Sequence, residues 1–152
     1  MKSLRALVPL FAAVILAVTP ASAQEEDKTE WLITIQGDVS EVHDGGLTMA
    51  VPANGIAFTD RPERRVAFVD LAAFVATAWA EDGPLRADPP NASLIDESSN
   101  AVAVVTITTM GYADGMLTVE LTLLEGALPA VGDTIALTID AYPTAVNDQI
   151  TD

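Results

Sequence analysis

The chain has 152 residues, of which 22 are acidic and 7 are basic, so its formal charge at pH 7 is −15. It has no cysteine and one histidine, which excludes disulfides, cysteine–zinc sites and any site that needs two histidines. The acidic charge also argues against nucleic acid as a partner, because phosphates need a basic surface.

Residues 1–23 have the pattern of a cleaved secretory signal. Lys2 and Arg5 give the N-terminal segment a positive charge, and an apolar run of 13 residues follows. Residues 21–23 are a small-x-small cleavage site. An uncleaved anchor of that length would reach only about 20 Å, short of a hydrocarbon core of roughly 30 Å. We therefore expect export to the periplasm or the medium, without membrane insertion after cleavage. The mature chain from Gln24 would carry a charge of −17.

The mature chain would have 129 residues, which is the size of one domain and enough for a core without disulfides. We expect one β-rich domain over 31–143. A disordered acidic stretch at 24–30 would precede it, and a frayed end at 144–152 would follow.

Apolar and polar residues alternate with a period of two in several short segments, which predicts strands with one buried face. Asp44-Gly45-Gly46 and residues 112–115 are typical hairpin turns. The last three strands are expected to form an antiparallel meander with one solvent-exposed face. The predicted strands are residues 31–39, 47–51, 56–59, 92–95, 102–109, 117–123 and 135–139.

One segment instead has the period of a helix. Apolar residues that share a helical face are Leu71, Phe74, Val75, Ala78 and Trp79. This spacing predicts a helix near 70–80, capped by Asp70 and stopped by Gly83-Pro84. As an alternative, residues 67–73 could continue as a buried strand. Pro84, Pro89 and Pro90 predict irregular or extended backbone over 85–91.

These elements predict a mainly β fold. We expect a small antiparallel β-sandwich or open barrel of six or seven strands, with one short α-helix near 70–80 covering an end or an edge.

A charged loop at 60–65 holds three of the five basic residues of the mature chain. Because arginine can grip a carboxylate or phosphate with two hydrogen bonds, one interpretation is an anion-binding loop built on Asp60, Arg61 and Arg64. The interpretation that we prefer is structural: Arg61 and Arg64 pair with nearby acids and fix the loop to the sheet.

A second polar cluster is Asp88-Pro89-Pro90-Asn91-Ala92. The prolines stiffen the backbone, and Asp88 and Asn91 can bond to turn amides, so a rigid corner before a strand is the preferred interpretation. The functional alternative is that Asp88 and Asn91 converge with Arg61 and Arg64 on one surface and bind a ligand there.

No catalytic residue is assigned. His43 lies beside a turn, and the chain has no Gly-x-Ser-x-Gly elbow to supply a nucleophile. No phosphate-binding loop or metal-ligand spacing predicts a cofactor or a metal. The acidic residues are scattered singly through turns, so only the fold could bring two of them together for hydrolysis or several of them onto a calcium ion.

The chain resembles a family of small exported bacterial proteins that has no assigned function. The resemblance rests on residues 58–64, Phe74-Val75 with Trp79, and Asp88-Pro89-Pro90-Asn91-Ala92; Leu124-Glu125-Gly126 with Leu128-Pro129 is also similar. Members often have an aromatic residue where this chain has Leu85, and a histidine where it has Val66-Ala67, which argues against a shared histidine site.

The function expected from the sequence is that of an exported, non-enzymatic module that binds a small ligand, a surface polymer or a protein partner, none of them identified. The alternatives are a carboxylate-based hydrolase and a structural or adhesive envelope protein, which would need long uncovered edge strands.

Overall fold

The computed structural model describes residues 30–59, 64–141 and 150–151. The expected signal, most of the acidic stretch after it and most of the expected frayed end lie outside these residues. The elements are β1 (Trp31–His43), β2 (Gly46–Ala50), β3 (Asn54–Thr59), β4 (Val66–Asp70), α1 (Leu71–Ala78), α2 (Pro84–Ala87), β5 (Asn91–Asp96), β6 (Val102–Ala113), β7 (Met116–Glu125), β8 (Thr134–Ala141) and β9 (Ile150–Thr151).

Six strands form a closed antiparallel barrel in the order β1-β2-β7-β6-β5-β8 and back to β1. The predicted mainly β fold is confirmed. Of the two expected architectures the structure has the barrel, which is closed where an open one was expected. On the side of β1, the sheet continues through β3 and β4 to the short β9, which pairs with two residues of β4.

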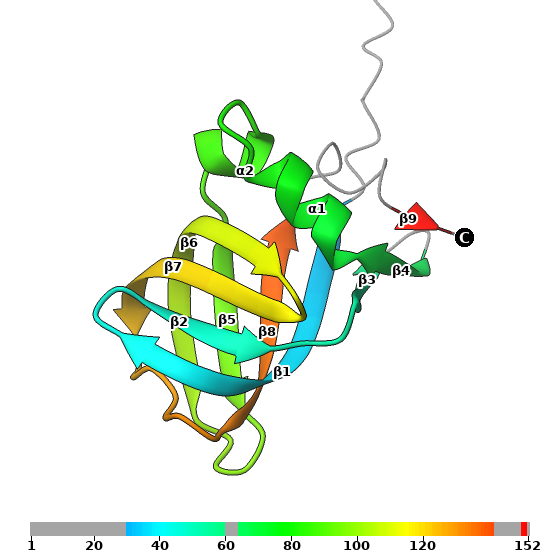
Figure 1. Ribbon diagram of the computed structural model, residues 1–152. Coiled ribbons are helices and arrows are strands. Elements are labelled where there is room, and N and C mark those ends of the chain that lie inside the picture. The colour runs from blue at the N-terminus through cyan, green and yellow to red at the C-terminus, as the bar shows by residue number, and fades with distance from the viewer. Residues whose placement is uncertain (1–29, 60–63, 142–149, 152) are drawn as a thin grey trace, which may run out of the picture.

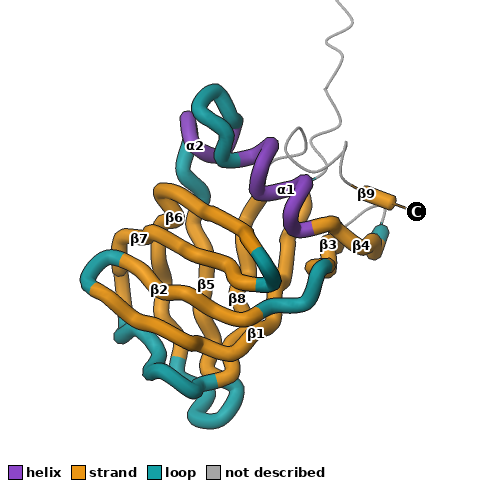
Figure 2. The backbone as a smooth tube through the Cα atoms, viewed as in Figure 1, coloured by secondary structure: helices purple, strands orange, loops and turns teal. Residues whose placement is uncertain are grey.

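The two ends of the barrel differ (Figures 1 and 2). The helices α1 and α2 lie across one end, which we call the helix end. The turn between β5 and β6 and the loop between β7 and β8 lie at the other, which we call the loop end. Side chains fill the barrel between them, as expected for so few strands. Within the described chain, Thr59 is the one polar residue that is buried.

β1 uses one of its edges for two different partners. Its first residues, 31–34, pair with β3, and its last residues, 38–43, pair with β2. Gly37 lies between these two stretches. A Cβ atom there would overlap the carbonyl oxygen of Ala50 and lie 2.7 Å from Met49 Cε. Closure of the barrel therefore depends on glycine at this position.

The predicted helix is confirmed as α1. Its buried side chains are Leu71, Phe74, Val75 and Ala78, and Trp79 directly after it is also buried. The Asp70 carboxylate accepts a hydrogen bond of 2.8 Å from the Ala73 N–H, so Asp70 caps the helix as predicted. The alternative of a strand over 67–73 is correct only as far as Asp70, where this cap turns the chain into the helix.

The expectation of irregular backbone over 85–91 is wrong for its first part. Pro84–Ala87 forms one helical turn, α2, with Gly83 as its N-cap residue. Proline is well suited to the first turn of a helix, because the N–H that it lacks would have no helical partner there. Pro84 therefore follows the end of α1 and is also the first residue of α2.

The expected meander of the last three strands is also wrong. β6 and β7 are neighbours, but β8 lies between β5 and β1. Alternation predicts which face of a strand is buried and does not predict its partner. The loop after β7 carries the chain across the loop end, where β8 completes the barrel.

Replacing Gly37 by alanine is expected to lower the free energy of unfolding by roughly 1–3 kcal/mol, because the new methyl group meets fixed backbone. Urea denaturation measures this. Gly111→Ala is the matched control: a Cβ there has no atom within 4 Å, so we expect a change of less than about 1 kcal/mol. Equal effects of the two substitutions would contradict the role of Gly37.

Candidate functional site

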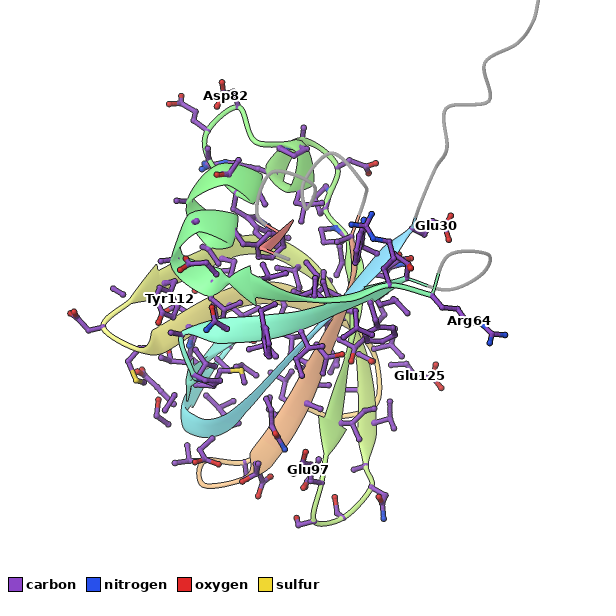
Figure 3. The ribbon with its side chains drawn as sticks, turned by 90° about the vertical axis from the view of Figure 1, so that its right-hand side faces the viewer. Glu30, Arg64, Asp82, Glu97, Tyr112 and Glu125 are labelled. Carbon is purple, nitrogen blue, oxygen red and sulfur yellow. The ribbon has the colours of Figure 1, made fainter. Side chains whose placement is uncertain are left out.

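The described part of the arginine loop lies at the start of β4; Asp60 and Arg61 lie outside the described residues. Arg64 has a left-handed backbone with φ of 46°, and its exposed side chain points away from the barrel (Figure 3). The guanidinium of Arg65 lies over the Trp31 ring, 5.5 Å from its centroid. Arg65 therefore contacts the barrel, although sequence reasoning had selected Arg61 and Arg64.

Asp88 and Asn91 flank the corner between α2 and β5. The Asp88 N–H donates to the carbonyl of Pro84 at the end of α2. Asn91 begins β5, and its side-chain oxygen accepts a hydrogen bond of 3.0 Å from the Thr106 hydroxyl. Both residues are exposed. These bonds fit a structural corner.

The two sequence clusters lie at the helix end but are not adjacent. Between the start of β4 and the start of β5 the sheet contains β3, β1 and β8. The starts of β4 and β5 are thus four strand spacings apart, which is about 19 Å along the sheet. No hydrogen bond or ion pair joins Arg64, Asp88 and Asn91 to one another in the described chain. The structure thus brings these three residues to one end without forming a common pocket.

A pocket of about 250 Å³ lies at the loop end. Leu94 and Ile135, both buried core residues, contribute to its lining. The loop between β7 and β8 contributes apolar residues that include the half-buried Leu128 and Pro129. Its charged residues are Asp96, at the end of β5, and Asp133, just before β8. The site therefore combines apolar walls with two carboxylates.

Asp96 is held in a tight turn by its neighbours. The hydroxyls of Ser98 and Ser99 donate to its two carboxylate oxygens at 2.7 and 2.8 Å, and the Ser98 N–H donates at 2.8 Å. These bonds, above all that from the Ser98 hydroxyl, lower the pKa of Asp96 to about 2. The carboxylate is therefore ionised at any physiological pH.

Asp133 has a different environment. Its Oδ2 atom accepts a hydrogen bond of 2.8 Å from the Ala130 N–H. Within the described chain no hydrogen bond reaches its Oδ1 atom, so this oxygen can accept one from a ligand.

The loops that form the pocket are tied to the barrel. Gly132 N–H donates to the Val39 carbonyl, and Val39 N–H donates to the Asp133 carbonyl, at 2.8 and 2.9 Å. On the other side, the Glu97 carboxylate accepts a hydrogen bond from the Gln36 side chain. Glu97 marks this end of the molecule in Figure 3. These hydrogen bonds hold in place the two connecting segments that line the pocket.

Sequence reasoning missed this site because its residues come from β5, β8 and two connecting segments. A signal was nevertheless present: residues 127–131 are all apolar, although loops are usually polar and solvated. Val131 in this loop is 63% exposed.

His43 Nε2 lies 3.1 Å from Glu120 Oε1, and both side chains are exposed. The described residues contain no group of three or more histidine, cysteine or acidic side chains that could hold a metal ion. They also contain no helix long and apolar enough to cross a membrane.

Comparison of the chain with models of protein families, with curated proteins and with solved structures finds no match. The candidate site is therefore judged on its geometry and chemistry alone.

Because folding lowers the pKa of Asp96, its carboxylate is expected to stabilise the fold above about pH 4, the pKa range of an unfolded aspartate. This contribution is lost as the pH falls through about 2. The difference in unfolding free energy between the natural chain and Asp96→Asn should thus shrink between pH 4 and pH 2. Urea denaturation at several pH values tests this. Ser98→Ala with Ser99→Ala should reproduce the effect, whereas a difference that stays constant with pH would contradict it.

Proposed function

We propose that this chain is an exported, non-enzymatic module that binds a small ligand in the loop-end pocket. The observation that carries this proposal is the pocket itself, with its apolar walls and its two carboxylates. Its volume of about 250 Å³ lies below the roughly 300–1,000 Å³ of pockets that take drug-sized ligands. The ligand is therefore smaller than a typical drug-sized molecule.

The chemistry of the pocket favours a small apolar molecule that carries a positive charge. Apolar walls favour a hydrocarbon body, since burial of apolar surface contributes about 25 cal/mol per Å². A cationic group can pair with Asp133 Oδ1. The formal charge of −15 adds a field that attracts cations and repels anions. An aliphatic ammonium ion meets all three conditions.

Asp96 does not suit the role of proton donor in the alternative of a hydrolase. Glycoside hydrolysis with two carboxylates needs one of them as a proton donor, with a raised pKa. The pKa of Asp96 is shifted in the opposite direction, to about 2. An ionised Asp96 therefore suits the binding of a cation better than the donation of a proton.

An adhesive role is supported less well than binding. Strand-by-strand assembly uses long, exposed strand edges. Within the described chain, closure of the barrel pairs both edges of β2 and β5–β8 with neighbouring strands. The sheet ends at the short β9, which pairs with Phe68 and Val69 of β4.

The binding proposal is tested with cyclohexylammonium as the probe and cyclohexanol, which has the same ring without the charge, as its neutral match. Isothermal titration calorimetry at pH 7 should give saturable binding of the amine. Ala101 lines the pocket with an exposed side chain, so Ala101→Phe should fill the pocket and abolish binding without unfolding the protein. Ala113→Phe, an exposed alanine at the hairpin between β6 and β7, is the matched control and should bind normally.

Asp133→Asn tests the charge of the ligand. Asparagine keeps an oxygen that can accept from the Ala130 N–H, so the loop should be retained. We expect the affinity for the amine to fall by up to about fivefold, as for a solvent-accessible ion pair, with no change for the alcohol. Binding of the amine that survives Ala101→Phe would place the ligand elsewhere and contradict the proposed site.

Export is tested separately in a bacterial host. The exported protein should have the mass of the chain that begins at Gln24, because residues 21–23 form the cleavage site. Ala23→Lys should block cleavage, whereas Ala23→Gly, which keeps a small residue, should not. Full-length protein that stays in the cytoplasm would contradict export.

A further inference from the structure

Exposed apolar side chains lie next to the residues that line the loop-end pocket. Val102 directly follows Ala101, and Val131 directly follows Ala130, and both of these alanines line the pocket. The side chain of Val102 is 51% exposed, and that of Val131 is 63% exposed. The apolar surface at this end of the barrel therefore extends beyond the walls of the pocket.

The end of β7 adds a third side chain to this surface. Leu124 is 56% exposed and lies three residues before Ala127, which also lines the pocket. Gly126 lies directly against β6, because a Cβ atom there would be 2.4 Å from the Val102 carbonyl oxygen. Leu124 and Val102 are therefore held on neighbouring strands at the same end. We call Val102, Leu124 and Val131 the apolar rim.

The charges beside the pocket are negative. The turn between β5 and β6 and the loop between β7 and β8 contain no lysine, arginine or histidine. They contain Glu97 and Asp133, and the strands before them end in Asp96 and Glu125. The arginines of the described chain lie elsewhere, directly before β4 and in α2. A partner that complements this surface is therefore positively charged.

A free small amine would leave the apolar rim in contact with water. A ligand of about 250 Å³ fills the pocket without covering the side chains outside it. Exposed apolar patches edged by polar residues are typical of protein interaction sites. In such interfaces one central side chain fills a pocket, and the contacts around it exclude water. The rim thus favours a ligand that is one side chain of a larger molecule.

Lysine is the side chain that matches the pocket. Its stem of four methylene groups is apolar and its end is an ammonium ion, so it is itself an aliphatic amine. Arginine is less suitable, because its planar fork pairs best with both oxygens of one carboxylate. Asp133 offers Oδ1 alone, since its Oδ2 accepts the hydrogen bond from the Ala130 N–H.

We propose that the loop end is a docking surface for a basic protein or peptide that inserts one lysine side chain into the pocket. The ammonium group pairs with Asp133 Oδ1, and apolar side chains beside the lysine pack on Val102, Leu124 and Val131. This inference rests on the proposed small-ligand site and names the kind of partner that supplies the ligand.

The test compares three pentapeptides that are acetylated at the N-terminus and amidated at the C-terminus. The first is Gly-Leu-Lys-Leu-Gly, the second has acetyllysine in place of lysine, and the third has glycine in place of both leucines. Calorimetry at pH 7 should show the first binding most tightly. Loss of the leucines should weaken binding at least about tenfold, because less apolar surface is buried, and loss of the charge about fivefold.

Substitutions in the rim locate the bound peptide. Val131→Ser should weaken binding of the leucine peptide about fivefold and leave binding of cyclohexylammonium unchanged, because Val131 does not line the pocket. Val66→Ser is the matched control: Val66 is also an exposed valine, 75% accessible, but lies at the start of β4. It should leave binding of the peptide unchanged.

The outcomes separate this inference from the proposed function. Cyclohexylammonium that binds, together with equal affinities for the leucine and glycine peptides, would overturn the docking surface alone. Equal effects of Val131→Ser and Val66→Ser on the leucine peptide would do the same. Failure of cyclohexylammonium to bind would overturn the small-ligand site, and this inference with it.

Discussion

The close approach of β1 and β2 beside Gly37 is the contact on which the rest of the structure depends. β1 leaves β3 and joins β2 within a few residues, and only a residue without a side chain fits against the Ala50 carbonyl there. This step closes the sheet. Closure pairs the edges of the barrel strands, encloses one apolar core without disulfides, and gives the molecule two distinct ends. The polar groups considered for function lie at those two ends.

The two ends of the barrel differ in their polar groups. At the helix end, the buried indole N–H of Trp31 has no hydrogen-bond partner, and the guanidinium of Arg65 lies over the Trp31 ring. At the loop end, Asp96 and Asp133 are acceptors beside apolar walls. The acidic charge of the chain supports cation binding at the loop end.

Much of the fold could be predicted from sequence, because local patterns report local structure. The face of α1 and its cap at Asp70 follow from helical spacing and from the chemistry of an N-cap. The partners of β8 could not be predicted, since alternation reports a buried face and not a neighbour. The helix of Pro84–Ala87 was missed because proline can begin a helix as well as end one. The loop-end pocket was missed for a related reason: Leu94 and Ile135 are far apart in the chain, and only the pairing of β5 with β8 brings them together.

The central claim is that this closed barrel presents a ligand site at its loop end, and amide NMR spectra of the isotopically labelled protein test it most directly. Addition of cyclohexylammonium should shift the amide signals of Leu94, Asp96, Leu128 and Asp133 along one saturable curve. The indole signal of Trp31, about 20 Å away along β8, should stay in place. Shifts spread over the acidic surface without saturation, or confined to the helix end, would contradict the account.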